Sequence, residues 1–113
     1  MRRVIVESPY ASPLPAEVEG NIEYARACVR DSLSRGEAPI ASHLLYTQEG
    51  ILDDKVPEER RQGIEAGLAW RHAADATVVY VDRGISEGMQ RGIDDAKEHG
   101  RPIEIRTLGG ADD

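Results

Sequence analysis

Aromatic side chains are scarce in this sequence, which has no phenylalanine and only 4% aromatic residues among its 113 positions. A core built on aromatic rings is therefore excluded, and valine, isoleucine, leucine and alanine must fill it. A chain of this length is about one domain and buries roughly two-thirds of its unfolded surface, which suffices for a core without metals or disulfides. We expect one domain over residues 1–108 and a frayed acidic tail over 109–113.

Cysteine is scarce, and long apolar runs are missing. Cys28 is the single cysteine, so no internal disulfide can form, which is typical of a reducing compartment. No apolar run approaches the ~18 residues of a membrane span. The opening segment, "MRRVIVESPY", has too short an apolar run for a signal peptide. We therefore expect a cytoplasmic protein with no membrane partner.

Positive charge is the third shortage, with 14 Lys and Arg against 21 Asp and Glu and a net charge of -7. Binding to a nucleic-acid backbone needs clustered cations, so no nucleic-acid partner is expected. A small anion remains compatible, because a few N–H groups at a helix start can hold it. The three histidines, His43, His72 and His99, are not closely spaced with one another or with Cys28, so we expect no metal and no other cofactor.

The pattern that is present alternates short β-branched runs with stretches of helical periodicity. The strands are expected in "RRVIVESPY", "EAPIASHLL", "ATVVYVD" and "RPIEIRTL", and the helices over residues 15–35, 56–73 and 86–100. The expected buried helix positions are Ile22, Ala25, Val29, Leu33, Ile64 and Leu68, with Trp70 as a further candidate. Strands separated by helices favour a parallel α/β sheet with right-handed crossovers.

In such sheets, ligands bind beyond the carboxyl ends of the strands, where the strand order reverses. This rule points to the loops after Val6, Ala41 and Val81. The polar side chains in these loops are Glu7, Ser8, Tyr10, Ser42, His43, Asp82, Ser86 and Glu87. One edge of the sheet is thus expected to carry carboxylates, hydroxyls, an imidazole and a helix start.

Several of these residues also have a purely structural interpretation. Ser86 is suited to cap the following helix by bonding the N–H of Gly88 or Met89, or to contact a ligand. Asp82 can end its strand by turning the loop, and His43 can be a hydrogen-bonded structural histidine. Tyr10 could pack flat over the sheet edge, and Met89 is expected in the core. A serine triad of the G-x-S-x-G type is unsupported, because the sequence lacks that motif.

Four segments together carry a resemblance to a known family: "ESPYA", "GNIEYAR", "PIASHLL" and "ADATVVYVDRGISEGMQRGIDDAKEHGRPIEIR". They resemble the nucleoside 2-deoxyribosyltransferase-like superfamily, which includes the 2'-deoxynucleoside 5'-phosphate N-hydrolases. The likeness covers nearly the whole chain and is greatest to small members from phages and actinobacteria. It implies a flavodoxin- or Rossmann-like three-layer domain with strand order 2-1-3-4.

The resemblance also implies a chemistry. In the enzymes, a glutamate in the helix after the third strand attacks the anomeric carbon of deoxyribose, the base leaves, and water or a second base resolves the glycosyl-enzyme. A tyrosine of the first loop and an aspartate near the sugar assist. Carried over to this chain, the catalytic candidates are Glu87, Tyr10 and Asp82. The ligand-binding candidates are Glu7, Ser8, Pro9, His43, Ser86, Gly88 and Met89.

The nucleophile is where the likeness fails. In a gapless alignment, the position of the enzymes' glutamate falls on Gly92. Glu87 lies five residues earlier and points about 140° away around the helix axis. Glu7 is another carboxylate at the same sheet edge. Glycine weakens a helix by up to ~1 kcal/mol relative to alanine, so Gly92 would serve to make room for a ligand or a neighbouring element.

Two classes of function therefore stay open. The chain either cleaves or transfers the N-glycosidic bond of a deoxynucleoside or its monophosphate, or it binds such a ligand without catalysis. Completion of the site by another chain is a third alternative. A small-molecule nucleoside or nucleotide is the expected partner, and Leu68 with Trp70 could form the interface of a homodimer.

Overall fold

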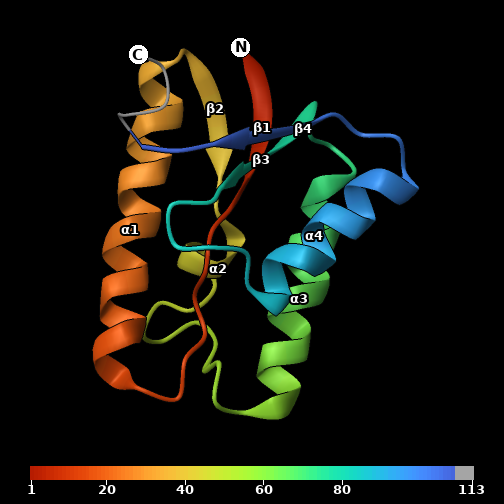
Figure 1. The fold of residues 1–113 in the computed structure, drawn as a ribbon. Coiled ribbons are helices and arrows are strands. Elements are labelled where there is room, and N and C mark those ends of the chain that lie inside the picture. Colours follow the sequence, from red (N-terminus) through yellow and green to blue (C-terminus); the bar gives the residue numbers. More distant parts are fainter. Residues whose placement is uncertain (109–113) are drawn as a thin grey trace.

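The computed structural model describes residues 1–108, and the predicted fraying of residues 109–113 lies outside them. The chain alternates strands and helices as predicted (Figure 1). The elements in chain order are β1 (Arg2–Glu7), α1 (Pro15–Ser34), β2 (Glu37–Ile40), α2 (Ser42–Leu45), α3 (Pro57–Arg71), β3 (Ala76–Tyr80), α4 (Glu87–Glu98) and β4 (Ile103–Arg106). None of the helices in this part of the chain is long and apolar enough to cross a membrane.

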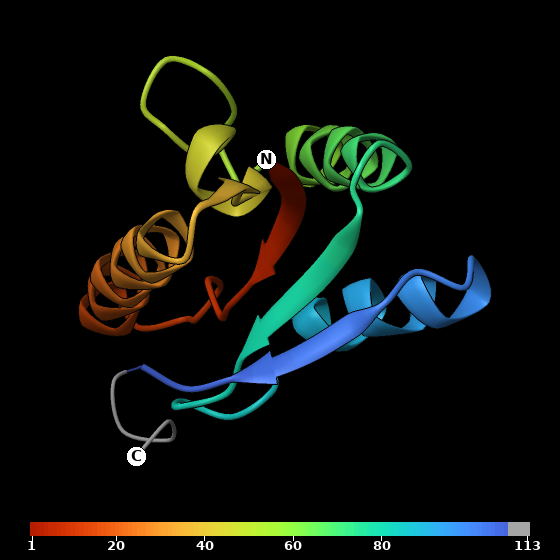
Figure 2. The same ribbon diagram turned by 90° about the horizontal axis from the view of Figure 1, so that it is seen from above.

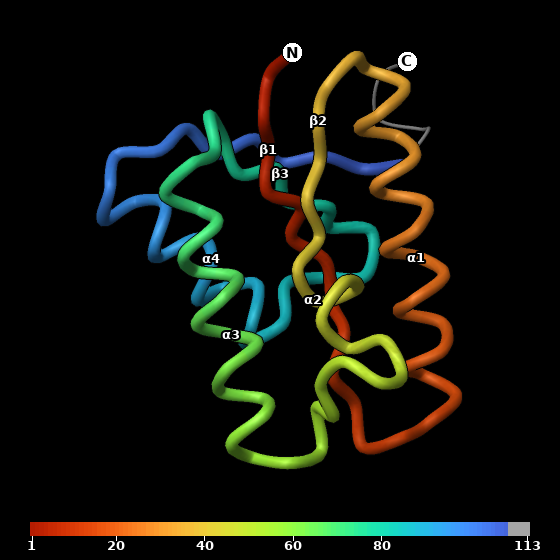
Figure 3. Tube along the Cα trace, turned by 180° about the vertical axis from the view of Figure 1, so that it is seen from behind, coloured from red at the N-terminus to blue at the C-terminus, as the bar shows by residue number. Residues whose placement is uncertain are grey.

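The four strands form one parallel sheet with the order β2-β1-β3-β4, which confirms the predicted fold class and strand order. Figure 2 shows α1 on one face of the sheet and α3 and α4 on the other, so the domain has three layers. Because β1 and its neighbour β2 are parallel, their carboxyl ends point toward the same end of the molecule. At that end the loop after α2 passes between α1 and α3 (Figure 3).

The prediction that "EAPIASHLL" forms one strand is wrong in its second half. Pairing ends at Ile40, and residues 42–45 form the short helix α2. The Ala41 carbonyl accepts the N–H groups of Leu44 and Leu45 at 3.0 and 3.2 Å, so the chain turns as soon as it leaves the sheet. Leu44 then packs against the core from this turn. The turn places His43 beyond the strand end.

Two apolar clusters hold the layers together. On the α1 side, Val4, Val6, Cys28, Val78 and Tyr80 pack together, and all five are buried. On the α4 side the cluster consists of Val79, Met89 and Ile93. The core is aliphatic as predicted apart from Tyr80, and the predicted core position of Met89 is confirmed.

The helices bury slightly different faces from those predicted. In α1 the buried stripe is Ala25, Cys28 and Ser32, and Leu33 is 54% exposed beside it. The buried residues keep helical spacing, but Cys28 and Ser32 each lie one position before the predicted Val29 and Leu33. Trp70 of α3 is 46% exposed, and its Nε1 donates to the Tyr46 hydroxyl at 2.8 Å, so it is not the core residue that the periodicity allowed.

Candidate functional site

A cavity of about 340 Å³ opens at the carboxyl ends of the strands, between the loop after β1, α2, α3 and the start of α4. The cavity lining brings together most residues that the sequence singled out: Glu7, Ser8, Tyr10, Ser42, His43, Ser86, Glu87, Gly88 and Met89. Pro9 is buried in the same loop, outside that lining. Ligand pockets of small molecules begin at about this volume.

Glu7 and Arg71 form a buried ion pair on the cavity wall. Glu7 is the last residue of β1 and Arg71 the last of α3, and they are 5% and 8% exposed. Arg71 donates to one oxygen, Glu7 Oε2, from Nη2 and from Nε, the latter at 3.1 Å. Burial raises the pKa of the Glu7 carboxyl, and the positive charge of Arg71 opposes that rise. The pair as a whole is electrically neutral.

Each partner of this pair keeps an unused polar atom. Among the described residues, Glu7 Oε1 and Arg71 Nη1 take part in none of the hydrogen bonds. In that part of the chain, the fully buried side-chain polar atoms that lack a hydrogen-bond partner belong to Thr77, Arg106 and Thr107. Neither Glu7 Oε1 nor Arg71 Nη1 is among them. Glu7 Oε1 and Arg71 Nη1 therefore retain open surface, and their residues line the cavity.

Gly92 explains how the Glu7 carboxylate reaches this place. It is a buried residue of α4. A Cβ added at this position would overlap Glu7 Oε2 and lie 2.5 Å from Glu7 Cδ and 2.9 Å from Arg71 Nη2. The missing side chain is thus replaced by the carboxylate of Glu7, which enters the same space from β1. The room predicted at Gly92 is taken by a neighbouring element.

Ser8 and His43 form a second polar pair beside the first. Ser8 Oγ lies 2.8 Å from His43 Nε2, and the Tyr10 ring meets the imidazole edge-on at 6.3 Å. Burial, and then the nearby charge of Arg71, lower the pKa of His43 to about 4. The imidazole is therefore neutral at pH 7.

The start of α4 carries a serine cap, one of the two roles that the sequence allowed for Ser86. Ser86 Oγ accepts the N–H of Met89 at 3.2 Å, and the Ser86 N–H lies 3.3 Å from Met89 Sδ. The Met89 N–H is thus already bonded. The Glu87 side chain is 93% exposed and lies 3.7 Å from Arg91, which places it at the rim of the cavity, turned toward solvent.

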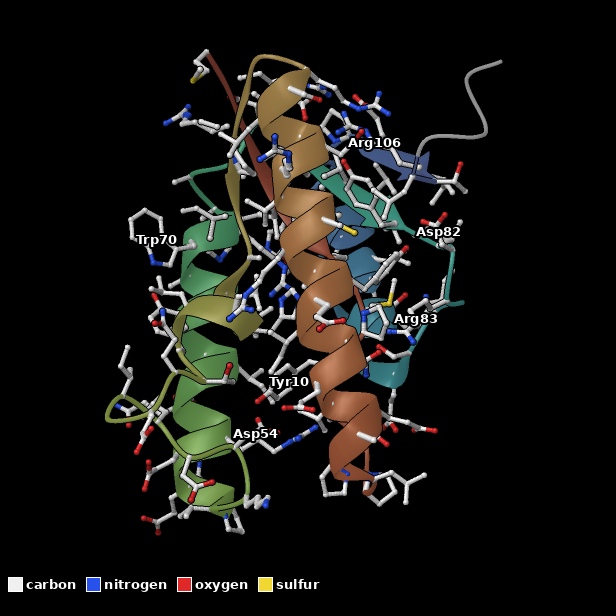
Figure 4. The ribbon with its side chains drawn as sticks, turned by 90° about the vertical axis from the view of Figure 1, so that its left-hand side faces the viewer. Tyr10, Asp54, Trp70, Asp82, Arg83 and Arg106 are labelled. Atoms are coloured by element: carbon white, nitrogen blue, oxygen red, sulfur yellow. The ribbon has the colours of Figure 1, made fainter. Side chains whose placement is uncertain are left out.

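Asp82 lies outside the cavity lining. Its carboxylate accepts the Tyr24 hydroxyl at 2.5 Å and the Leu108 N–H at 3.0 and 3.1 Å. Figure 4 shows Tyr10 and Asp54 between α1 and α3, with Asp82 apart from them on the other side of α1. In this position Asp82 fastens the loop after β3 to α1 and to the segment after β4.

Arg71, Arg60 and Asp54 line the cavity and are among its residues that had no role in the sequence-based prediction. Arg71 is the last residue of α3, where a cation suits the helix dipole, so no signal in the sequence marked it as a site residue. Arg60 lies in the charged segment "PEERRQ" at the start of α3, where it is half-buried and lies 2.9 Å from Asp54. Arg60 and Asp54 also line an adjoining cavity of about 730 Å³.

Metal ligands do not gather in the described residues, where no three His, Cys, Asp or Glu side chains are placed to hold an ion. The polar groups of the cavity instead form a carboxylate–guanidinium pair and a hydroxyl–imidazole pair. Such groups can bind an uncharged polar molecule and supply a nucleophile.

Comparison with known proteins places the chain in a family. The sequence model of a domain of unknown function, DUF7768, matches residues 2–106. The chain belongs to this family. The DUF7768 domain is similar in structure to the 2-deoxyribosyltransferase of the psychrotolerant bacterium Bacillus psychrosaccharolyticus, with a TM-score of 0.64 and 17% identity over 96% of this chain and 74% of that one. At this identity the likeness shows a shared fold. No curated protein sequence matches the chain.

Proposed function

We propose that the cavity at the strand ends binds a nucleoside or nucleotide and that Glu7 cleaves its N-glycosidic bond. The observation that carries the proposal is the exchange between Gly92 and Glu7. The segment that supplies a glutamate in the deoxyribosyltransferase-like enzymes has glycine here, and a carboxylate from β1 fills the space of the missing side chain. A reactive carboxylate is thus kept on the cavity wall while its point of attachment has moved.

The state of Glu7 suits a nucleophile. Burial raises the pKa of Glu7 and Arg71 opposes that rise, so Arg71 holds Oε2 and favours the ionised form. Oε1 makes no hydrogen bond among the described residues. Attack of Oε1 on the anomeric carbon would break the bond to the base, which takes a proton from Tyr10 or from water. Water then hydrolyses the glycosyl ester and restores the carboxylate. Tyr10 lines the same cavity.

The charges around the cavity favour a ligand of low charge. Four carboxylates and three guanidiniums line it, namely Glu7, Asp54, Glu59, Glu87, Arg60, Arg71 and Arg91. This near balance offers no field for a polyphosphate, and a net charge of -7 opposes one at longer range. We therefore place deoxynucleosides and their monophosphates ahead of triphosphates as ligands.

A second candidate, binding without cleavage, rests on the same ion pair. Arg71 engages Glu7 with two N–H groups, and a carboxylate so held is a weaker base and a weaker nucleophile than a free one. In that case the unbonded Oε1 and Nη1 would serve only as acceptor and donor for the ligand.

A panel of 2'-deoxynucleosides and their 5'-monophosphates separates the two candidates. Free base is measured by chromatography, and binding by the ligand-induced rise in melting temperature, which reports any ligand that binds the folded chain. Glu7→Gln is compared with Glu87→Gln and with a matched control, Glu65→Gln on the exposed side of α3.

Base release by the wild type that is lost in Glu7→Gln and kept in both other variants supports cleavage by Glu7. Loss in Glu87→Gln alone would move the nucleophile to Glu87. A melting shift without base release leaves the binding function, and the absence of both removes the proposal.

A further inference from the structure

The Ser8–His43 pair is the chemical feature of the cavity that the proposed cleavage by Glu7 leaves unused. A serine hydroxyl hydrogen-bonded to an imidazole is the arrangement by which a base activates a hydroxyl nucleophile. We propose that Ser8 and His43 form a nucleophile–base pair that hydrolyses small carboxylic esters in this cavity.

The pair has the geometry that proton transfer needs. Ser8 Oγ and His43 Nε2 are 2.8 Å apart, within the range of a nucleophile and its base. Both residues are fixed by their surroundings: Ser8 is buried directly after β1, and α2 holds His43 through the bonds to the Ala41 carbonyl and through Thr47, whose hydroxyl donates to the His43 carbonyl. The lowered pKa of His43 keeps the imidazole neutral, so it acts on the Ser8 hydroxyl as a weak base and the geometry of the pair carries the proposal.

The cavity also supplies a hydrogen-bond donor and room for a substrate. Arg71 acts electrostatically on His43, so its guanidinium lies near the pair, and its Nη1 is unbonded among the described residues. A fixed guanidinium of this kind stabilises the oxyanion that forms when a hydroxyl attacks a carbonyl. The volume of about 340 Å³ limits the acyl group to a small one.

The reaction balances with water as the only co-reactant. Ser8 Oγ bonds to the carbonyl carbon as its proton passes to His43 Nε2, and the departing alcohol takes that proton as its bond to carbon breaks. Water then attacks the acyl-serine, giving its proton to His43. The acyl bond breaks with release of the carboxylic acid, and Ser8 regains the proton.

The test uses diisopropyl fluorophosphate, which phosphorylates an activated serine with loss of fluoride, and p-nitrophenyl acetate as the ester. Intact mass and peptide mapping of the labelled wild type locate the adduct without any variant. The variants are Ser8→Ala and His43→Gln, with Ser34→Ala at the end of α1 and His99→Gln at the end of α4 as matched controls. Melting curves establish that each variant is folded.

We expect one adduct on Ser8 and ester turnover that disappears in Ser8→Ala. A general base contributes roughly 100-fold or more, so labelling and turnover should fall about 100-fold in His43→Gln and stay unchanged in the two controls. An unlabelled wild type, a label on another residue, or equal rates in His43→Gln and the wild type would each overturn the proposal. The outcome is independent of whether Glu7 releases a base.

Discussion

Gly92 shows how the absence of a side chain can define a site. Glycine at this helix position costs stability, but it leaves a space in which two buried charged groups meet. The ion pair of Glu7 and Arg71 therefore depends on Gly92, which contributes to it only by leaving space. Such a dependence is invisible in the composition of the helix and is read only from the packing.

Gly92→Ala should destabilise the protein, because the new methyl group overlaps Glu7 and crowds Arg71. Overpacking of a buried site costs about 1–3 kcal/mol, and a disturbed buried ion pair adds to this. Gly88→Ala in the same helix is the matched control, since its added Cβ meets nothing closer than 3.8 Å. Urea unfolding of both variants is the measurement, and equal stabilities would contradict the account.

His43 gives a prediction for stability against pH. Its pKa is about 4 in the folded protein and 6.5 ordinarily, so the unfolded chain takes up the proton first as the pH falls. Stability should decrease between about pH 6.5 and pH 4, by up to about 3 kcal/mol from this residue. His43→Gln should lose this dependence. A wild type and variant with parallel unfolding profiles over that range would be inconsistent with a neutral imidazole of lowered pKa.

At the scale of elements, a charged network joins the outer strands of the sheet. Arg106 of β4 donates to both oxygens of Glu37 at the start of β2, at 2.8 and 2.7 Å, and to Glu104 at 2.8 Å. Figure 4 shows Arg106 at the end of the molecule opposite Tyr10, so this network holds the sheet and lies away from the cavity. The hydrogen bonds that Glu37 accepts from Arg106 lower the pKa of the Glu37 carboxyl to about 2.

The stability that Glu37 contributes should be lost in a lower pH window than that of His43. It is fully present above the ordinary pKa of 4.5 and decreases as the pH falls toward 2, by about 3 kcal/mol in total. Glu37→Gln should remove it, while Glu104→Gln, on a half-exposed partner of the same arginine, should cost much less. Thermal unfolding between pH 2 and 7 tests this, and equal losses in both variants would argue against a special role for Glu37.

Secondary structure and the parallel sheet were within reach of the sequence because they depend on local periodicity. The alternation of "ATVVYV" with amphipathic stretches indicated the α/β class, the family resemblance supplied the strand order, and the strand-end rule located the cavity. The turn of α2 was missed because "ASHLL" is apolar enough to continue a strand. Strand β2 ends at Ile40 because its pairing with β1 ends there, which the sequence alone does not show. Arg71 was missed because its partner, Glu7, lies 64 positions away in the sequence. Pairings of that separation are set by tertiary packing.

At the scale of the whole molecule, we predict that the chain forms a homodimer through the region of Trp70. Leu68, its expected companion, lines the cavity, whereas Trp70 points outward (Figure 4), and Leu45 and Ile51 are exposed as well. Light scattering coupled to size-exclusion chromatography should give the mass of two chains, and Trp70→Ser should shift the equilibrium toward one. A wild-type monomer at all concentrations would contradict the prediction.

The central claim is that Glu7, delivered from β1 into the space left by Gly92, is the reactive carboxylate of a nucleoside site. The most direct measurement is the mass of the protein, quenched in acid during incubation with a 2'-deoxynucleoside whose base it releases. The account predicts one added deoxyribosyl group on the peptide that contains Glu7, absent in Glu7→Gln. Base release that continues in Glu7→Gln, or an adduct on a different carboxylate, would contradict it.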